Sequence, residues 1–149
     1  MNPPLRLLIA FQQRHSDPPS YVLQVPGRDM WLAAAHSGNN SYTLVAPDLD
    51  ANTTFDLHSA RLRKTNIRRP LPRWSRYPAG VLATLADSGQ LQLPGMLTVM
   101  AGDEPSGPRY EYALGMAFGA LWYVVNGGAC DEPCLINLLS RVQKRYMQP

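Results

Sequence analysis

The chain has 149 residues, a formal net charge of +3, 45% hydrophobic residues and 17% charged residues. This size and composition predict one folded domain over residues 1–149 and exclude a mostly disordered chain. The longest apolar run, residues 112–125, is shorter than the roughly 20 residues of a membrane span, and the N-terminus lacks a signal-peptide pattern. We therefore expect a soluble, cytoplasmic protein with no membrane partner.

The first half of the chain predicts one short helix and four strands. An amphipathic helix is expected over residues 5–15 and ends at the sequence Asp-Pro-Pro. Strands are predicted over residues 21–25, 30–35, 42–46 and 53–59, with turn-forming residues between them. The last strand alternates polar and apolar residues, which favours a sheet edge with one face in water.

The second half predicts three helices and one more strand. The first helix is expected within residues 74–88, from Pro78 onward, with Gly89 as its C-cap. A strand follows over 95–100, then an apolar helix over 111–126 and a last helix over 131–147, with Asp131 as N-cap. The order of helix, strands, helix, strand, helix and helix predicts an α+β fold.

Basic residues are concentrated in one window that contains no acidic residue, between Asp56 and Asp87. The window could bind nucleic acid, with Trp74 and Tyr77 stacking on bases. No nucleic-acid motif accompanies it, so a solvated loop is the favoured interpretation and we do not expect a nucleic-acid partner. The seven basic residues are Arg61, Arg63, Lys64, Arg68, Arg69, Arg73 and Arg76.

Other motifs carry weaker signals. Cys130 and Cys134 cannot complete a zinc site by themselves, so we interpret them as small core or surface residues and predict no metal. Gly115 and Gly119 form a GxxxG motif, which in a soluble helix predicts close packing against a neighbouring element. Residues 102–127 read as a strand end, a Gly/Pro-rich turn and an apolar helix, an arrangement that binds phosphate in several folds.

Several of these segments, in this order, resemble the N-terminal half of a galactokinase, a member of the GHMP sugar-kinase superfamily. PGR at residues 26–28 resembles the start of that family's PGRVNLIGEHTDYNGG motif. PRWSRYPAGVL resembles its W-x-x-Y-x-x-G-V helix, and GDEPSG at 102–107 resembles the GD-x-P-x-G sequence that introduces its phosphate loop. The resemblance implies a two-layer α+β sandwich of the ribosomal S5 domain 2-like type, with the C-terminal GHMP domain absent.

The resemblance also implies where the functional residues should lie, and most are replaced. Arg28 is the only retained candidate catalytic residue. The sugar-binding Glu, His and Asp of the family correspond to Ala34, Ala35 and Ser37. The corresponding phosphate-loop positions are Gly102, Asp103, Gly107, Pro108 and Arg109.

The replaced phosphate loop also differs in chemistry. Its serines are absent, Pro108 has no N–H to offer, and Glu111 should repel an anion. We therefore expect a degenerate galactokinase-like domain without sugar phosphotransfer, acting as a binding or regulatory module. No cofactor is expected in that case. The protein partner would be another chain, or a second copy, that covers the face left by the missing domain.

Two alternatives stay open. The chain could be the N-terminal half of an ATP-dependent sugar kinase that a separate chain completes, and only that alternative requires ATP and Mg. It could instead be a basic module that binds anions or nucleic acid through its arginines.

Overall fold

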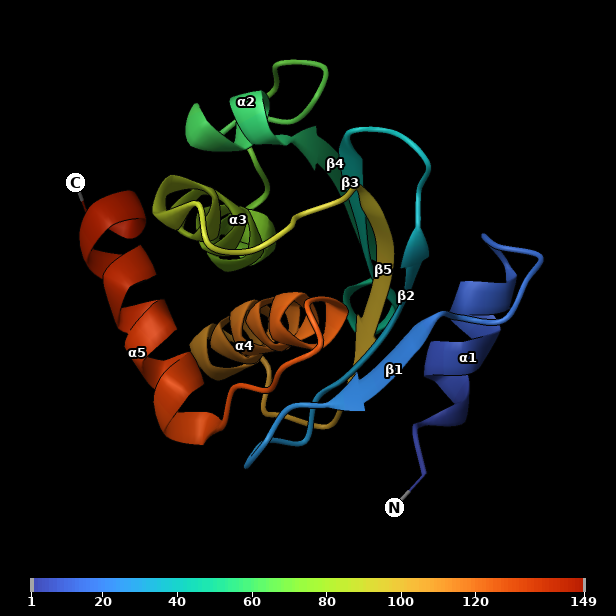
Figure 1. Cartoon of the computed structure of the whole chain (residues 1–149). Helices are drawn as coiled ribbons and strands as arrows, with labels where there is room; N and C mark the ends of the chain where they lie inside the picture. The colour runs from blue at the N-terminus through green and yellow to red at the C-terminus, as the bar shows by residue number, and fades with distance from the viewer. Residues whose placement is uncertain (1, 149) are drawn as a thin grey trace.

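The computed structural model describes residues 2–148, and its centre is one five-stranded sheet (Figure 1). The strand order is β1-β2-β5-β3-β4. The pair β3 and β5 is parallel, and the other three pairs are antiparallel. The strands are β1 (Tyr21–Gln24), β2 (Trp31–His36), β3 (Ser41–Ala46), β4 (Ala51–Asp56) and β5 (Met96–Ala101).

Helices cover both faces of this sheet. The helices α3 and α4 pack on one face, α5 lies outside them, and α1 covers the opposite face (Figure 1). The mixed sheet with its packed helices confirms the α+β fold class. The helices are α1 (Leu5–Gln12), α2 (Leu57–Arg61), α3 (Arg76–Ser88), α4 (Pro108–Val125) and α5 (Glu132–Val142); a π-helical turn follows over Gln143–Met147, and 3₁₀ turns occupy Pro47–Leu49 and Arg73–Ser75.

The inner strand β2 contributes to both cores of the molecule. Successive side chains of a strand point to opposite faces, and five residues of β2, from Trp31 to Ala35, are buried. Leu32 and Ala34 belong to the large core beneath α3 and α4. Trp31, Ala33 and Ala35 belong to the smaller core beneath α1. The same core explains why α4 is apolar on nearly all sides, since other elements surround it.

The predicted strand over 53–59 is correct in its first part and wrong in its last three residues. The strand β4 lies at a sheet edge with one wetter face, as predicted, but it ends at Asp56. There the Asp56 carboxylate accepts a hydrogen bond from the Ser59 N–H at 2.7 Å, and Ser59 Oγ accepts one from the Asp56 N–H at 3.0 Å. This reciprocal capping box starts α2 in place of further strand.

Two helices begin earlier than the sequence predicts. Proline lacks only the N–H that the first helical turn leaves unused. The helix α3 therefore begins at Arg76, two residues before Pro78, and α4 begins at Pro108, three residues before Glu111. The predicted caps are confirmed: Gly89 ends α3 with a left-handed backbone, and Asp131 accepts a hydrogen bond from the Cys134 N–H at 3.0 Å.

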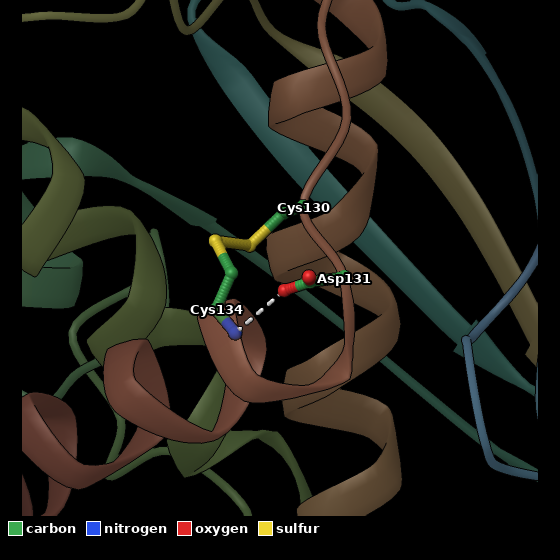
Figure 2. Close-up of a disulfide and its surroundings, with 3 residues drawn as sticks. All are labelled: Cys130, Asp131 and Cys134. Carbon is green, nitrogen blue, oxygen red and sulfur yellow. Dashed lines mark hydrogen bonds between the residues drawn. A yellow bond between two sulfur atoms is a disulfide. The ribbon is translucent and has the colours of Figure 1, made fainter.

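The interpretation of the two cysteines as unlinked small residues is corrected by the structure. Cys130 and Cys134 form a disulfide, with their Cα atoms 5.4 Å apart (Figure 2). The spacing of the two cysteines in the sequence indicates neither a zinc site nor, by itself, a disulfide. The turn that Asp131 caps brings the two side chains together, because it reverses the chain at the start of α5.

The GxxxG motif of α4 packs as predicted for a soluble helix. A Cβ atom on Gly115 would lie 2.7 Å from Tyr77 Cβ of α3, and one on Gly119 would lie 2.9 Å from Leu138 Cδ2 of α5. The glycines thus let α4 approach both neighbouring helices closely. Among residues 2–148, no helix is both long and apolar enough to cross a membrane.

Candidate functional site: an arginine pocket at the start of α4

A pocket of about 380 Å³ opens where the turn between β1 and β2 meets the starts of α3 and α4. Arginines from three separate segments face it, and two tyrosines form much of its remaining wall. The arginines are Arg28, Arg73, Arg76 and Arg109; the other lining residues are Tyr77, Pro108, Glu111, Tyr112 and Met147.

Arg28 reaches the pocket from a tight turn between β1 and β2. Gly27 has a φ of 77°, a left-handed conformation that glycine adopts without strain. The turn is closed by hydrogen bonds from the Val25 N–H to the Met30 carbonyl and from the Arg28 N–H to the Val25 carbonyl. The guanidinium lies over the Tyr112 ring, 5.7 Å from its centroid, which is cation–π geometry.

The Nε–H of Arg28 is buried and has no hydrogen-bond partner among residues 2–148. The nearest carboxylate oxygen is Glu132 Oε2, at 3.9 Å, which is an ion-pair distance but too long for a hydrogen bond. A buried donor without an acceptor carries a free-energy cost. Glu132 is therefore the nearest candidate acceptor for this donor among the described residues.

Glu111 does not act in the pocket as a free negative charge. Its Oε1 lies 3.3 Å from Arg73 Nε, so the carboxylate that should repel an anion is paired instead. Burial raises the pKa of Tyr77, and the nearby Glu111 carboxylate raises it further. Burial also raises the pKa of Tyr112, against the opposing effect of Arg28. Both phenols are therefore neutral hydrogen-bond donors at neutral pH, and they line the pocket beside its arginines.

Glu104 joins the turn of Arg28 to the segment before α4. Its Oε2 accepts a hydrogen bond from the Asp29 N–H at 2.7 Å, and its Oε1 lies 3.7 Å from Arg109 Nη2. Close approach of the two backbones strengthens this link, because a Cβ on Gly102 would lie 2.1 Å from the Asp29 carbonyl oxygen. The segment 102–107 is therefore fixed against the turn of Arg28.

The other side of the same segment is occupied by the Asp48 carboxylate. Asp48 accepts hydrogen bonds from the Gly102 N–H at 3.0 Å, the Tyr110 hydroxyl at 2.7 Å and Arg6 Nε at 2.6 Å. Arg6 Nη2 also donates to Asp103 Oδ1 at 2.9 Å. The chain's own carboxylates thus take the backbone and side-chain donors on this side, which leaves little for an external anion.

The predicted phosphate-loop positions are accordingly divided between two sites. Pro108 and Arg109 line the arginine pocket together with Arg28. Gly102 and Asp103 lie with Asp48 and Arg6 on the opposite side. Gly107, between them, has a φ of 102° and a ψ of −147°, and no side chain caps the helix that follows. This backbone region is accessible essentially only to glycine.

The predicted sugar positions are not brought together with Arg28. Ala34 and Ala35 are buried in β2 and belong to the two cores on opposite faces of the sheet. Ser37 follows the far end of β2, where its hydroxyl donates to the Asn39 side chain and the Ser41 carbonyl. Because a six-residue strand is roughly 20 Å long, Ser37 lies far from the turn of Arg28.

The basic residues of the window between Asp56 and Asp87 do not form one surface, which the sequence did not indicate. Of its residues, only Arg73, in the 3₁₀ turn before α3, and Arg76, the first residue of α3, line the pocket. Arg61 pairs with Asp87, and Arg63 donates to the Tyr146 carbonyl while lying 4.7 Å from that ring's centroid. The sequence predicted a helix only from Pro78 onward, so it left both arginines outside that element. Nothing in the sequence indicates that they converge on Arg28.

The residues that line the arginine pocket do not fit a Mg-bound nucleotide. Among residues 2–148, no group of three or more His, Cys, Asp or Glu side chains could hold a metal ion. Pro108 has no N–H for a phosphate, and the one carboxylate that lines the pocket among residues 2–148 is paired with Arg73. The donor set of guanidinium and phenol groups suits an anion without a metal.

Comparison with known proteins supports the fold alone. No protein-family model matches the sequence, and no curated protein matches it. Among solved structures, the Methanococcus jannaschii mevalonate kinase matches 77% of the chain with a TM-score of 0.60 and 10% identity. The Lactococcus lactis galactokinase, solved with galactose, matches 83% of the chain with a TM-score of 0.63 and 16% identity.

The Streptococcus pneumoniae phosphomevalonate kinase, solved with phosphomevalonate and AMPPNP, matches 76% of the chain with a TM-score of 0.50 and 20% identity. This chain covers 36%, 31% and 32% of the three kinases, so it spans about a third of their length. The fold is therefore similar to the N-terminal domains of GHMP kinases, at low sequence identity.

Proposed function

We propose that this protein is a GHMP kinase-like domain that does not transfer phosphate and that binds a small, multiply charged anion in the arginine pocket. The observation that carries the proposal is the convergence of Arg28, Arg73, Arg76 and Arg109 on one pocket whose single lining carboxylate is already paired. Arginine presents a planar fork of donors that matches phosphate and carboxylate oxygens.

The charge balance of the pocket favours an anion over a neutral ligand. Four guanidinium groups and one carboxylate line the pocket; with Glu104, 3.7 Å from Arg109, and Glu132, 3.9 Å from Arg28, the set keeps a formal excess of one positive charge. Like charges held together are destabilising, and a ligand of opposite charge relieves that repulsion. The Arg28 side chain lines the pocket and is 23% exposed, so a ligand oxygen can reach its guanidinium group.

We propose the absence of phosphotransfer because the positions that correspond to the kinases' sugar-binding and phosphate-loop residues lack groups that could hold a substrate. Transfer requires groups that position phosphate and metal. At the corresponding positions of this chain, Ala34 and Ala35 are core residues, and Pro108 offers no N–H.

A galactokinase ancestry, as distinct from another GHMP kinase, is proposed from the PGR and GDEPSG motifs. A protein partner, or a second copy of the chain, is also a proposal.

The test measures binding and transfer separately. Isothermal titration calorimetry with inorganic pyrophosphate, at low salt and without metal, should show saturable binding to the full chain. Replacing Arg73 and Arg76 together with glutamine should weaken binding by about tenfold or more, because a hydrogen bond to a charged group contributes roughly 1.5–3 kcal/mol. A coupled assay with ATP, Mg and galactose should show no turnover.

A surface control is Arg69→Gln, which removes one positive charge from an exposed position that does not line the pocket. It should bind pyrophosphate as the wild type does. Equal weakening by the control and the pocket variant would indicate non-specific charge attraction and contradict the pocket. Turnover of ATP with galactose would contradict the loss of transfer and favour the kinase alternatives.

A further inference from the structure

We propose that the Cys130–Cys134 disulfide is a redox latch that controls how strongly the arginine pocket binds anions, acting through Glu132. The proposal rests on the proposed function of that pocket, since it assigns a regulator to the same site. Glu132 is the first residue of α5 and lies between the two cysteines in the chain. Any change in the turn that the disulfide closes therefore moves this carboxylate.

The disulfide and one hydrogen bond hold the start of α5 in place. The Asp131 side chain accepts from the Cys134 N–H, within the loop that the two sulfur atoms close (Figure 2). Cys130 is buried, with 6% of its surface exposed, whereas Cys134 is half-buried beside the exposed Asp131 and Pro133. An external thiolate can therefore approach the bond from the side of Cys134.

The Glu132 carboxylate rests directly on the turn that presents Arg28. A Cβ atom on Gly27 would lie only 2.1 Å from Glu132 Oε2, so the carboxylate rests against Gly27 and a side chain there would have to displace it. The same oxygen lies 3.9 Å from the buried Arg28 Nε. In the disulfide form, Glu132 is thus a built-in counter-charge of Arg28 and competes with an incoming anion.

Reduction would release this counter-charge. A small dithiol supplies the two electrons and two protons: its thiolate attacks Cys134 Sγ, forms a mixed disulfide and expels the Cys130 thiolate. The second thiol of the reductant then displaces Cys134 and closes the reductant's own disulfide, leaving two cysteine thiols on the protein. Without the bond, the first turn of α5 frays and Glu132 leaves Gly27. Anion affinity should then rise.

Hydrogen exchange tests the coupling without any ligand. The oxidised chain and the chain treated with dithiothreitol are compared by mass spectrometry; the reagent has no other target, because these are the only two cysteines. The latch predicts severalfold faster exchange both at residues 130–136 and at residues 25–30. Faster exchange confined to 130–136 would mean that the disulfide is only a local staple, which overturns the proposal.

Pyrophosphate titration then tests the effect on the site. Reduction should increase affinity roughly two- to fivefold, the effect expected from one partly exposed ion pair. Glu132→Gln should give the higher affinity in both redox states. Asp87→Asn, which removes a charge that is paired with Arg61 outside the pocket, should keep the redox response. The double variant Cys130→Ser/Cys134→Ser should behave as the reduced chain does.

The outcomes separate the two proposals. Equal pyrophosphate affinity in both redox states overturns the latch and leaves the anion pocket intact. No binding in either state refutes the anion pocket, and the hydrogen-exchange result still decides whether the disulfide controls the turn of Arg28.

Discussion

The side chain of Asp48 links three separate elements of the fold. Its side chain is 18% exposed and accepts hydrogen bonds from Arg6, Tyr110 and the Gly102 backbone. Burial opposes ionisation of Asp48, but these three hydrogen bonds outweigh it and hold the pKa of the carboxyl below its usual value. Burial, together with the hydrogen bond to Asp48, raises the pKa of the Tyr110 hydroxyl. Asp48 thus joins α1, the end of β5 and α4.

We predict that Asp48→Asn lowers the free energy of unfolding by about 1–3 kcal/mol at pH 7, because charged hydrogen bonds are lost while their donors stay partly buried. Since the folded pKa is depressed, the contribution of Asp48 is present above its unfolded pKa and is lost as the pH falls through the folded value. The difference between wild type and variant should therefore shrink in acid. Urea unfolding between pH 7 and pH 3 measures it.

The control for Asp48 is Asp103→Asn. Asp103 also bonds Arg6, but its side chain is 75% exposed, so solvent screens the interaction. This variant should change stability by less than about 1 kcal/mol at any pH. Equal losses in the two variants would show that the network around Asp48 contributes no more than an ordinary surface pair.

At the scale of elements, the helix layer depends on the closeness of α4 to its neighbours. Gly115 faces Tyr77 Cβ and Leu139 Cδ1, at 2.7 Å and 2.8 Å from a hypothetical Cβ. Gly119 faces Leu138 Cδ2 at 2.9 Å, the far end of a flexible side chain. The contact at Gly115 involves an atom attached directly to the α3 backbone, which has less freedom to move.

We predict that Gly115→Ala destabilises the protein by about 1–3 kcal/mol through overpacking. Gly119→Ala should be near neutral, because the roughly 1 kcal/mol gain in helix propensity offsets a small shift of Leu138. Because Tyr77 lines the arginine pocket, Gly115→Ala should also weaken pyrophosphate binding. Thermal unfolding of the two variants, measured side by side, distinguishes them, and a larger loss at Gly119 would contradict the argument.

At the scale of the whole molecule, ligand binding should appear as stability. Anything that binds only the folded state stabilises it by mass action, by about 2.7 kcal/mol at a hundredfold excess over Kd. For a chain of this size we therefore predict that saturating pyrophosphate raises Tm by roughly 5–10 °C. The shift should shrink as salt is added, because the arginine pocket is open to solvent.

The matched measurement uses the Arg73→Gln/Arg76→Gln variant, whose own Tm without ligand serves as its reference. It should show little or no shift with pyrophosphate, while Arg69→Gln should respond as the wild type does. A shift of the same size in all three proteins would place the binding outside the arginine pocket.

The sequence by itself determined the elements and the fold class. Hydrophobic periodicity and Gly/Pro punctuation are local properties, so they predicted every strand of the sheet and the helices α1, α3, α4 and α5. They also predicted the caps at Gly89 and Asp131. They missed α2 and the disulfide, and other errors lie at boundaries, as at Asp56, where a side chain capped the backbone and ended a strand that its alternating pattern would have continued.

Only the tertiary structure decided the site. Arg28 and Arg109 are far apart in the chain, and they meet because the Glu104 carboxylate fixes the segment before α4 against the turn after β1. The expected repulsion by Glu111 was offset by Arg73, a pairing that no local pattern encodes. No local pattern encodes the contact between the Glu132 carboxylate and Gly27 either. Such contacts depend on three-dimensional distances between charges, whereas a sequence pattern records only their spacing along the chain.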